Sequence, residues 1–397
     1  MNLLSDRIQN LSESQTIAMN RKSREMKERG IDVISLSLGE PDFNTPDFIK
    51  EAAKQAIDDN YTYYPPIAGY KDVREAISAK FKRDNDLDYA ADQIVVSTGA
   101  KQSIANVVLC TINPGDEVLL PAPYWVSYYE IVKLAGGKPV VIPTKIENDF
   151  KITGEELESY ITAKTRMMIF SSPCNPSGSV YTANELKDLA RVIKLHPELL
   201  IISDEIYELI NFDGVHASLA ADQDIYDQVI TVNGVSKGFA MTGWRCGYIG
   251  APLWLAKACD KMQGQFTSAT SSITQRAVLA AVTAEPKSVA YMKDAFKERR
   301  DLVLEMLSKI PGIETNLPEG AFYIFPNVEK LFSKKHNGNE IGNCNDLCLF
   351  LLEEAHVGLV PGDAFGSPNC IRISYAASED TLREALKRIK SAIEKLS

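Results

Sequence analysis

Lys237 and Arg245 stand eight positions apart in a segment rich in small residues, after a β-like run at residues 229–232. A primary amine in a partly dry pocket can be the neutral nucleophile that condenses with a carbonyl. A guanidinium can bind a phosphate through two parallel hydrogen bonds. An ordinary surface lysine after a strand is the alternative, and this pair alone does not exclude it.

A second group of residues lies where open α/β sheets bind ligands, directly after a β-like run. Gly99, Ala100 and Lys101 stand between residues 93–97 and a helical pattern. Small residues there let backbone N–H groups approach a phosphate at the helix N-terminus, although tight turns use the same residue types. An amine that forms a Schiff base, placed beside a phosphate site, is what pyridoxal phosphate requires.

Three further side chains suit such a cofactor or its substrate. Asp204 follows the buried-strand pattern at 199–203 and could pair with a pyridine nitrogen, or it could cap a helix. Trp125 could stack on a ring or fill a core. Arg372, in the β-like run 370–374, has a planar fork that suits a carboxylate, although a surface strand would also accept it.

These motifs resemble, in residue type and in order, those of the class I pyridoxal-phosphate-dependent aminotransferases. The resemblance extends from Thr16 to Arg372, nearly the whole chain. Cys246 is a minor departure, because this position generally holds a small or aliphatic residue and cysteine behaves as a small hydrophobe. The motifs that carry the resemblance are residues 38–43, 64–69, 97–102, 123–125, 172–178, 203–207 and 232–248.

The resemblance implies a cofactor role for each matching residue. Lys237 carries pyridoxal phosphate as a Schiff base and then serves as general base and acid. The other implied contacts are Gly99, Ala100, Lys101 and Arg245 near the phosphate, Asp204 on the ring nitrogen, Asn175 and the catalytic Tyr207 on the phenolic oxygen, and Trp125 on the ring face. Tyr64 is expected to reach the phosphate of a neighbouring subunit in a homodimer with shared active sites, with Tyr61 and Tyr63 as alternatives.

Within the family, the chain resembles bacterial and plant aspartate aminotransferases, some of which also use prephenate. The implied substrate contacts are Arg372 on the α-carboxylate with Gly39, Trp125 and Asn175 close by, and Lys101 and Thr16 on a distal carboxylate. The implied reaction moves the amino group of L-aspartate to 2-oxoglutarate, giving oxaloacetate and L-glutamate. An aminotransferase for prephenate, aromatic amino acids or alanine, or a pyridoxal-phosphate-dependent C–S lyase, is the alternative.

β-like runs alternate with helical patterns in the middle of the chain, which predicts an α/β fold with a mostly parallel sheet covered by helices on both faces. Thr182 and Glu185 form a capping box that marks the start of one helix. The resemblance implies the fold-type-I architecture of pyridoxal-phosphate-dependent transferases. We expect a large cofactor-binding domain at 46–286 and a smaller α+β domain at 287–397, which the N-terminal segment 1–45 joins.

Composition limits the partners. The net charge of -10 and the pI of about 5.1 argue against nucleic acid and against an anionic lipid surface. The four histidines are far apart and the seven cysteines form no C-x-x-C pair, so we predict no metal site and reduced thiols in a cytoplasm. We expect no secretory leader and no membrane span.

Two other classes of protein are disfavoured. A transcription regulator with an aminotransferase-like domain would need a basic helix-turn-helix extension ahead of it, and the enzyme-like segment begins almost at the start of the chain. A nicotinamide dehydrogenase would need a G-x-G-x-x-G turn after a strand, and no such turn is found.

Overall fold

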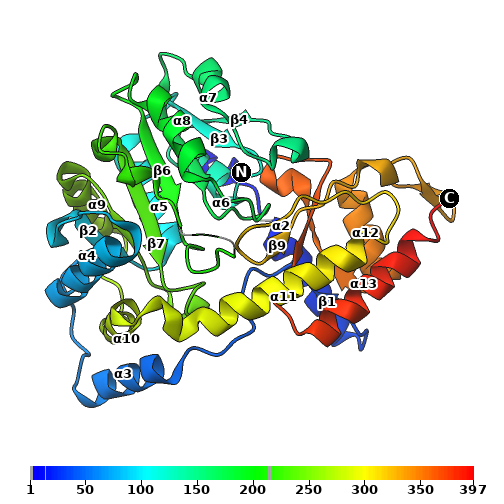
Figure 1. Cartoon of the computed structure of the whole chain (residues 1–397), viewed down its shortest axis with the longest axis horizontal. Coiled ribbons are helices and arrows are strands. Elements are labelled where there is room, and N and C mark those ends of the chain that lie inside the picture. Colours follow the sequence, from blue (N-terminus) through cyan, green and yellow to red (C-terminus); the bar gives the residue numbers. More distant parts are fainter. Residues whose placement is uncertain (1–2, 14, 213, 215) are drawn as a thin grey trace.

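The computed structural model describes residues 3–13, 15–212, 214 and 216–397. Its elements form a large part around a central sheet and a smaller part at the C-terminal end (Figure 1). The long helix α11 (Ala290–Leu307) runs from one part towards the other. Within the described ranges, no helix is both long enough and apolar enough to cross a membrane.

The central sheet has seven strands in the order β2-β8-β7-β6-β5-β3-β4. Its strands are β2 (Ile94–Ser97), β3 (Glu117–Pro121), β4 (Lys138–Ile142), β5 (Thr165–Ser171), β6 (Leu200–Asp204), β7 (Val229–Gly234) and β8 (Gly247–Gly250). Only β8 is antiparallel to its neighbours, β2 and β7, and the other pairs are parallel. The predicted mostly parallel sheet is therefore confirmed.

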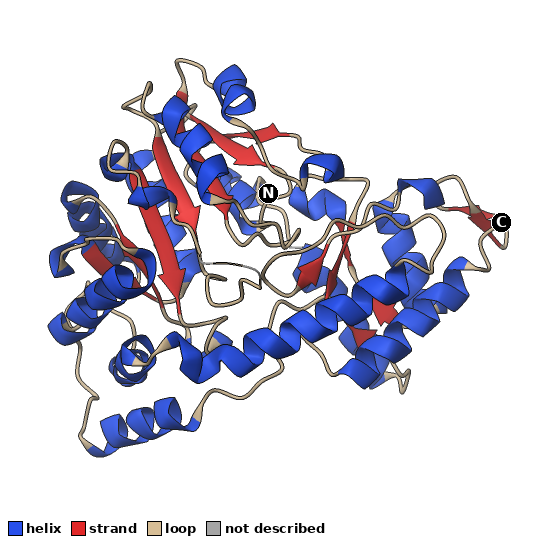
Figure 2. Ribbon diagram, viewed as in Figure 1, coloured by secondary structure: helices blue, strands red, loops and turns tan. Residues whose placement is uncertain are grey.

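Alternate residues of each strand point to opposite faces of this sheet. Val96 and Leu119 belong to one buried apolar cluster, whereas Val95 and Val118 belong to another. Helices supply many of the other apolar side chains of both clusters and so cover both faces (Figure 2). Those helices are α4 (Lys71–Asn85), α8 (Ala183–Ile193) and α10 (Ser272–Thr283) on the first face, and α5 (Ala100–Thr111), α6 (Ser127–Leu134) and α9 (Leu253–Phe266) on the second.

Helix α8 illustrates how sequence fixes such an element. Thr182 accepts from the backbone N–H of Glu185 while the Glu185 side chain returns to residue 182, which is the predicted capping box. Leu186, Ala190 and Ile193 then recur at helical spacing and are buried. This spacing places them on one face of the helix, against the sheet.

The smaller part combines the start and the end of the chain. Its elements are α2 (Gln15–Glu28), β1 (Ile34–Ser35), β9 (Tyr323–Ile324), α12 (Cys344–Glu354), β12 (Val357–Gly358), β13 (Val360–Pro361), β14 (Ile371–Ser374) and α13 (Glu379–Ile393). β1 pairs in parallel with β12, and β13, β14 and β9 form an antiparallel sheet in that order.

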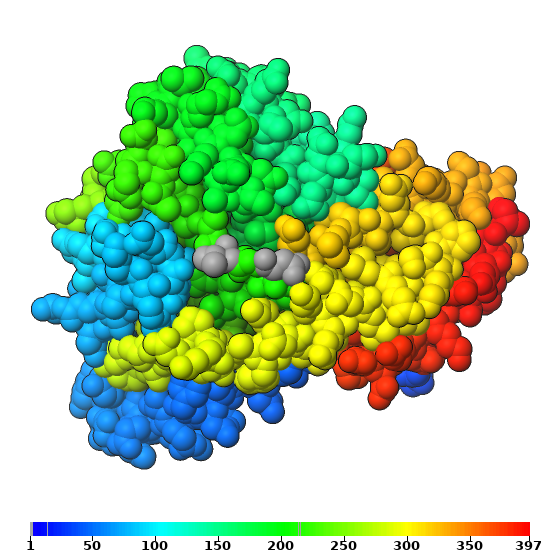
Figure 3. Space-filling view, viewed as in Figure 1, coloured from blue at the N-terminus to red at the C-terminus, as the bar shows by residue number. Residues whose placement is uncertain are grey.

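Three further α-helices are α1 (Asp6–Gln9), α3 (Asp47–Asp58) and α7 (Gly154–Tyr160), and a hairpin joins β10 (Lys335–His336) to β11 (Asn339–Glu340). Helix α3 packs against α10, and α7 packs against α8. The space-filling view places the blue residues around α3 at one end of the molecule and the red C-terminal residues at the other (Figure 3).

Candidate active site

The residues singled out from the sequence meet at the carboxyl-terminal edge of the central sheet. Ser97, Ser171, Asp204 and Gly234 end the parallel strands β2, β5, β6 and β7, so the segments that follow converge at one edge. They surround a cavity of about 260 Å³. The predicted residues that line it are Thr16, Gly39, Ala100, Lys101, Trp125, Asn175, Asp204, Tyr207, Lys237, Arg245 and Arg372.

Lys237 lies at the base of this cavity, just after β7. Its Nζ donates to the carbonyl oxygen of Gly39 at 2.5 Å and lies 5.7 Å from the ring centroid of Tyr207 and 5.9 Å from that of Phe322. Burial, and next the charge of Arg372, lowers the pKa of Lys237 to about 8. The amine is thus far easier to deprotonate than an exposed lysine, as a Schiff-base lysine must be.

Asp204 is buried at the end of β6. Its Oδ2 accepts from the hydroxyl of Tyr128 at 2.6 Å, and its Oδ1 accepts from the backbone N–H of Ile206 at 3.3 Å. Burial raises the pKa of Asp204 to about 6, although the Tyr128 hydrogen bond opposes that rise. A buried carboxylate of this kind is stabilised by a cation beside it.

Arg372 comes from β14 and is only 2% exposed. Its Nη1 donates to Oδ1 of Asn175 at 3.0 Å and its Nη2 donates to the carbonyl oxygen of Ser37 at 2.5 Å. The ring centroid of Tyr323 lies 4.6 Å from its Cζ, and its Nε has no hydrogen-bond partner in the described structure. A buried guanidinium with an unused donor is suited to a carboxylate ligand.

Gly99 does not line the cavity itself, but it lies close to the guanidinium of Arg245, which does. It immediately precedes α5 with a φ of 89°, and a Cβ built on it would lie 2.5 Å from Nη2 of Arg245. Nη1 of Arg245 donates to the carbonyl oxygen of Thr242 at 2.9 Å, which fixes the guanidinium beside the start of α5. A glycine with positive φ, the N-terminus of a helix and an arginine together suit a phosphate.

Lys101 and Trp125 form one wall of the cavity. Nζ of Lys101 lies 4.9 Å from the ring centroid of Trp125. Burial, and next the charge of Arg245, lowers the pKa of Lys101. Thr16, from α2, also lines this cavity, so the two residues predicted to recognise a distal carboxylate lie in the same cavity as Arg372.

Tyr64 does not line the cavity, and its side chain is 95% exposed. Tyr63 is 80% exposed. Tyr61 instead packs edge-to-face on Tyr70 with 5.8 Å between ring centroids, and Cζ of Arg276 lies 4.9 Å from its ring centroid. Of the three tyrosines, Tyr63 and Tyr64 are therefore the ones free to contact another molecule.

Nine of the residues that line the cavity were not identified from the sequence, and Tyr128, Ser236 and Tyr323 are among them. Ser236 directly precedes Lys237, so its position in the motif was a usable signal. Tyr128 follows Trp125 by three residues, about one helical turn. The signal for Tyr323 was weaker, because an aromatic residue in the apolar run 320–325 resembles ordinary core.

One group of three possible metal ligands occurs in the described part of the chain: Glu205, Glu208 and His216. Donors of the protein already contact both carboxylates, since Lys80 pairs with Glu208, and Nε2 of His216 lies 2.8 Å from Oε2 of Glu205. An ion-pair and hydrogen-bond cluster explains these residues without a metal. That the chain uses no metal remains a prediction.

The charges of the cavity fit pyridoxal phosphate. Asp204 and Arg372 are buried and Lys237 is half-buried. The hydrogen bonds of all three side chains within the described chain go to uncharged groups. Asp204 suits the ring nitrogen of the cofactor, Lys237 suits its aldehyde, and Arg245 with Gly99 suits its phosphate. Arg372 suits a carboxylate of the substrate. The fold and this set of residues define a pyridoxal-phosphate-dependent enzyme of fold type I.

Comparison with known proteins identifies the family. A family model described as aminotransferase class I and II matches residues 31–389, and the chain belongs to this family, whose cofactor is pyridoxal phosphate. The chain is 48% identical over 395 residues to a Petunia hybrida protein named bifunctional aspartate aminotransferase and glutamate/aspartate-prephenate aminotransferase, covering 98% of this chain and 82% of the plant protein. A probable aspartate/prephenate aminotransferase of Rickettsia bellii is 46% identical, with 99% of each chain covered.

Solved structures show the same similarity. The aspartate aminotransferase of Rhizobium meliloti superposes with a TM-score of 0.97 at 42% identity, covering 100% of both chains. The aspartate aminotransferase of Thermus thermophilus, solved with maleate, superposes with a TM-score of 0.93 at 38% identity, covering 99% of this chain and 100% of that one. The predicted fold-type-I architecture is therefore confirmed.

Proposed function

We propose that this enzyme transfers the amino group of L-aspartate to 2-oxoglutarate, giving oxaloacetate and L-glutamate. The observation that carries the proposal is the charge arrangement of the cavity, where the buried Arg372 and the exposed Lys101 both line the space beside Lys237. Lys237 and Arg245, which also line the cavity, are assigned to the cofactor, and the other two cations suit a substrate with two carboxylates. The names of the Petunia and Rickettsia relatives support the same substrate.

Bound pyridoxal phosphate supplies an electron sink for the electron pair left on the substrate when its Cα–H bond breaks. With the cofactor bound, Nζ of Lys237 would take the proton from the substrate Cα and then give it to C4′ of the cofactor, and its lowered pKa favours the neutral amine that the first transfer needs. Asp204 holds a proton on the ring nitrogen, because a carboxylate favours the cationic form of its neighbour. Asn175 and Tyr207 donate hydrogen bonds to the phenolic oxygen.

The remaining residues position the cofactor and the substrate. Gly99, Ala100 and Arg245 hold the phosphate, and Ser236, which is buried beside Lys237, joins them. Trp125 stacks on the ring. The family resemblance supports the roles of Gly99, Ala100, Arg245 and Trp125, and Ser236 is added because it lines the same cavity.

Arg372 binds the α-carboxylate, with the backbone of Gly39 close to it, while Lys101 and Thr16 recognise the distal carboxylate. The Thermus thermophilus enzyme was solved with maleate, a dicarboxylate, which supports a dicarboxylic substrate here. Guanidinium suits the α-carboxylate because its fork matches two oxygens, and ammonium suits a more variable distal group.

Prephenate is a second candidate substrate, because relatives named aspartate/prephenate aminotransferase match nearly the whole chain. Aminotransferases for alanine or aromatic amino acids and C–S lyases would share the cofactor contacts. Lys101 in the cavity lining favours a substrate with a distal carboxylate over these alternatives.

The assembly we propose is a homodimer in which Tyr64 of each subunit reaches the phosphate bound by the other. Its 95% exposure in the isolated chain supports this role, because an exposed tyrosine side chain is available to a partner. A cytoplasmic location is also proposed, on the ground that all seven cysteines are free thiols.

We further propose the division into a large domain, 46–286, and a small domain, 287–397, joined by the segment 1–45. The pairing of β1 with β12 supports the place of that segment. Residues 1, 2 and 14 of the segment lie outside the described residues.

A coupled assay tests the substrate proposal. Purified enzyme with pyridoxal phosphate is given 2-oxoglutarate with aspartate, alanine or phenylalanine, then prephenate with aspartate or glutamate, and cystathionine alone. The proposal expects the highest kcat/KM for aspartate and 2-oxoglutarate, and a Lys101→Ala variant that loses aspartate turnover far more than alanine turnover. Equal loss for both donors would contradict the role of Lys101.

A further inference from the structure

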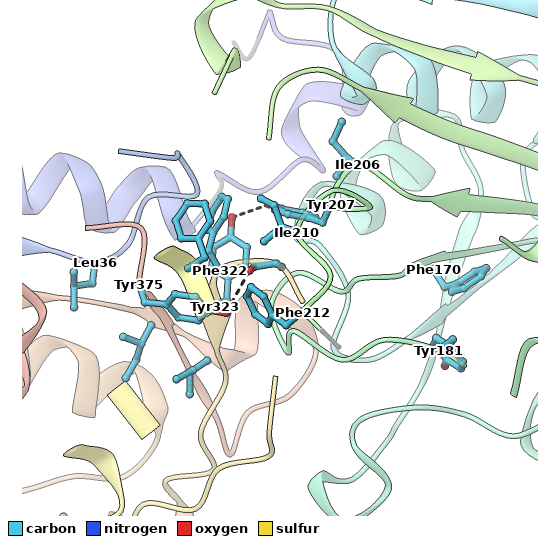
Figure 4. Close-up of a cluster of buried hydrophobic side chains, with 14 of the residues drawn as sticks. Leu36, Phe170, Tyr181, Ile206, Tyr207, Ile210, Phe212, Phe322, Tyr323 and Tyr375 are labelled. Carbon is cyan, nitrogen blue, oxygen red and sulfur yellow. Dashed lines mark hydrogen bonds between the residues drawn. The ribbon is translucent and has the colours of Figure 1, made fainter. Parts of the chain in front are cut away.

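The hydroxyl groups of Tyr207 and Tyr323 lie 2.8 Å apart, at the junction of the two parts of the molecule. Figure 4 shows this hydrogen bond between the two side chains. Tyr323 is completely buried on β9, where it pairs in register with Ser374 of β14, the strand that carries Arg372. Tyr323 therefore links the proposed cofactor tyrosine to the strand of the proposed substrate arginine.

The geometry allows either hydroxyl to donate in this hydrogen bond, and the role proposed for Tyr207 sets its direction. Tyr207 is the sole described hydrogen-bond partner of Tyr323, and a Cβ built on Gly39 would collide with the Tyr323 hydroxyl. Tyr207 and Tyr323 both line the cofactor cavity. If Tyr207 donates its single hydroxyl proton to the phenolic oxygen of the cofactor, as proposed above, its oxygen can only accept from the hydroxyl of Tyr323.

Arg372 and Phe322 both contact the ring of Tyr323. Cζ of Arg372 lies 4.6 Å from its ring centroid, a cation–π contact, and its ring packs against Phe322 with 4.8 Å between centroids. Its hydroxyl oxygen therefore has little freedom to move away from Tyr207, which makes it a fixed donor.

We propose that Tyr323 is a positioning residue of the reaction: its hydroxyl donates to Tyr207, so that the proton of Tyr207 is directed at the phenolic oxygen of the cofactor. A hydroxyl that accepts one hydrogen bond also becomes a stronger donor of the next, because the bonds polarise one another. The inference rests on the proposed function, since it needs the cofactor in this cavity with Tyr207 beside its phenolic oxygen.

The test is a pH titration of the visible absorption band of the holoenzyme. Hydrogen bonds to the phenolic oxygen favour the state in which that oxygen is negative, so a weaker bond raises the pH midpoint of the spectral change. Tyr323→Phe keeps the ring beside Arg372 and removes only the hydroxyl. We expect its midpoint to lie about 0.5–1 pH unit above that of the wild type.

Two controls separate positioning from general damage to the core. Tyr375→Phe removes the hydroxyl of another fully buried tyrosine of the same cluster (Figure 4), one that donates to the carbonyl oxygen of Ala321 at 3.3 Å; its midpoint should equal that of the wild type. In a Tyr207→Phe background, Tyr323→Phe should add no further shift, because both hydroxyls act through one contact.

The outcomes distinguish this inference from the proposed function. A wild-type holoenzyme without a titrating visible band would contradict the proposed function itself. A normal wild-type titration with an unshifted Tyr323→Phe variant would overturn the inference alone. Equal shifts in Tyr323→Phe and Tyr375→Phe, or a full additional shift in the Tyr207→Phe background, would also overturn it.

Discussion

The hydroxyl of Tyr128 donates to Oδ2 of Asp204 at 2.6 Å, and both residues line the proposed cofactor cavity. The two residues come from different elements, Tyr128 from α6 and Asp204 from the end of β6. Burial already raises the pKa of Asp204 to about 6, and this hydrogen bond keeps it from rising further. The charge state of Asp204 near neutral pH therefore depends on Tyr128.

Tyr128→Phe should raise the pKa of Asp204 above 6, because a hydrogen bond to an ionised group is lost. Asp204 must be ionised to hold the ring-nitrogen proton, so its function is lost as the pH falls through its pKa. We expect kcat to fall by about tenfold near pH 6.5 and much less near pH 8.5. Pre-steady-state kinetics across this range measure the effect.

Tyr129→Phe is the matched control, since Tyr129 is the next residue of α6 and stacks on Tyr124 with 6.2 Å between ring centroids. It should leave the pH profile unchanged. A pH-independent loss in Tyr128→Phe would mean that Tyr128 supports packing rather than the charge of Asp204.

Gly99→Ala should weaken the binding of pyridoxal phosphate by about tenfold or more, because the added Cβ displaces Arg245 from the phosphate site. Equilibrium dialysis of the cofactor gives the Kd. Gly115→Ala is the control, because Gly115 has a φ of 92° but nothing within 4 Å of an added Cβ. Both variants carry the backbone strain of about 1–3 kcal/mol, but only the first should lose affinity. Equal Kd values would exclude a role for residue 99 in phosphate binding.

Arg372→Lys should lower kcat/KM for aspartate by about a hundredfold or more, since disrupting a buried charge pair costs about 3–5 kcal/mol. Lysine keeps the charge but loses the fork that matches a carboxylate. Steady-state kinetics with aspartate and with 2-oxoglutarate measure the loss for both substrates. Arg388→Lys is the control, because Arg388 pairs with Asp32 on the surface. It should leave kcat/KM unchanged for both substrates. An unchanged KM in Arg372→Lys would place the α-carboxylate elsewhere.

Mixed dimers test the role of Tyr64. Tyr64→Ala chains should bind the cofactor weakly, and Lys237→Ala chains should be inactive. Random reassociation of equal amounts should restore about a quarter of wild-type activity, because each mixed dimer contains one complete site. Size-exclusion chromatography confirms the dimer, and a Tyr63→Ala chain is the comparison. No recovery beyond the sum of the parents would show that each subunit uses only its own residues.

The charged residues of the site could be predicted from the sequence because each stands in a short motif beside a strand. Lys237, Asp204 and Arg372 all line the cavity. Tyr128 and Tyr323 could not be predicted, because a phenol in an apolar run looks like core. The hydroxyl of Tyr128 bonds to Asp204, 76 positions away along the chain, and the hydroxyl of Tyr323 bonds to Tyr207, 116 positions away. Only the fold brings these partners together.

The parallel strands were also predictable, since each contains an apolar run, and all but the edge strand β4 are almost wholly buried. β8 was not predicted. It is only four residues long with glycine at both ends, and glycine weakens a strand pattern. Its place between β2 and β7 comes from the sheet around it rather than from its own sequence.

Borohydride reduction of the holoenzyme, followed by peptide mass spectrometry, is the most direct test of the central claim. Reduction makes the bond between the cofactor and its lysine permanent. We predict a pyridoxyl mass on the peptide that contains Lys237, and none there in a Lys237→Ala variant. A wild-type enzyme that carries the added mass on another lysine, or on none, would contradict the assignment of this site.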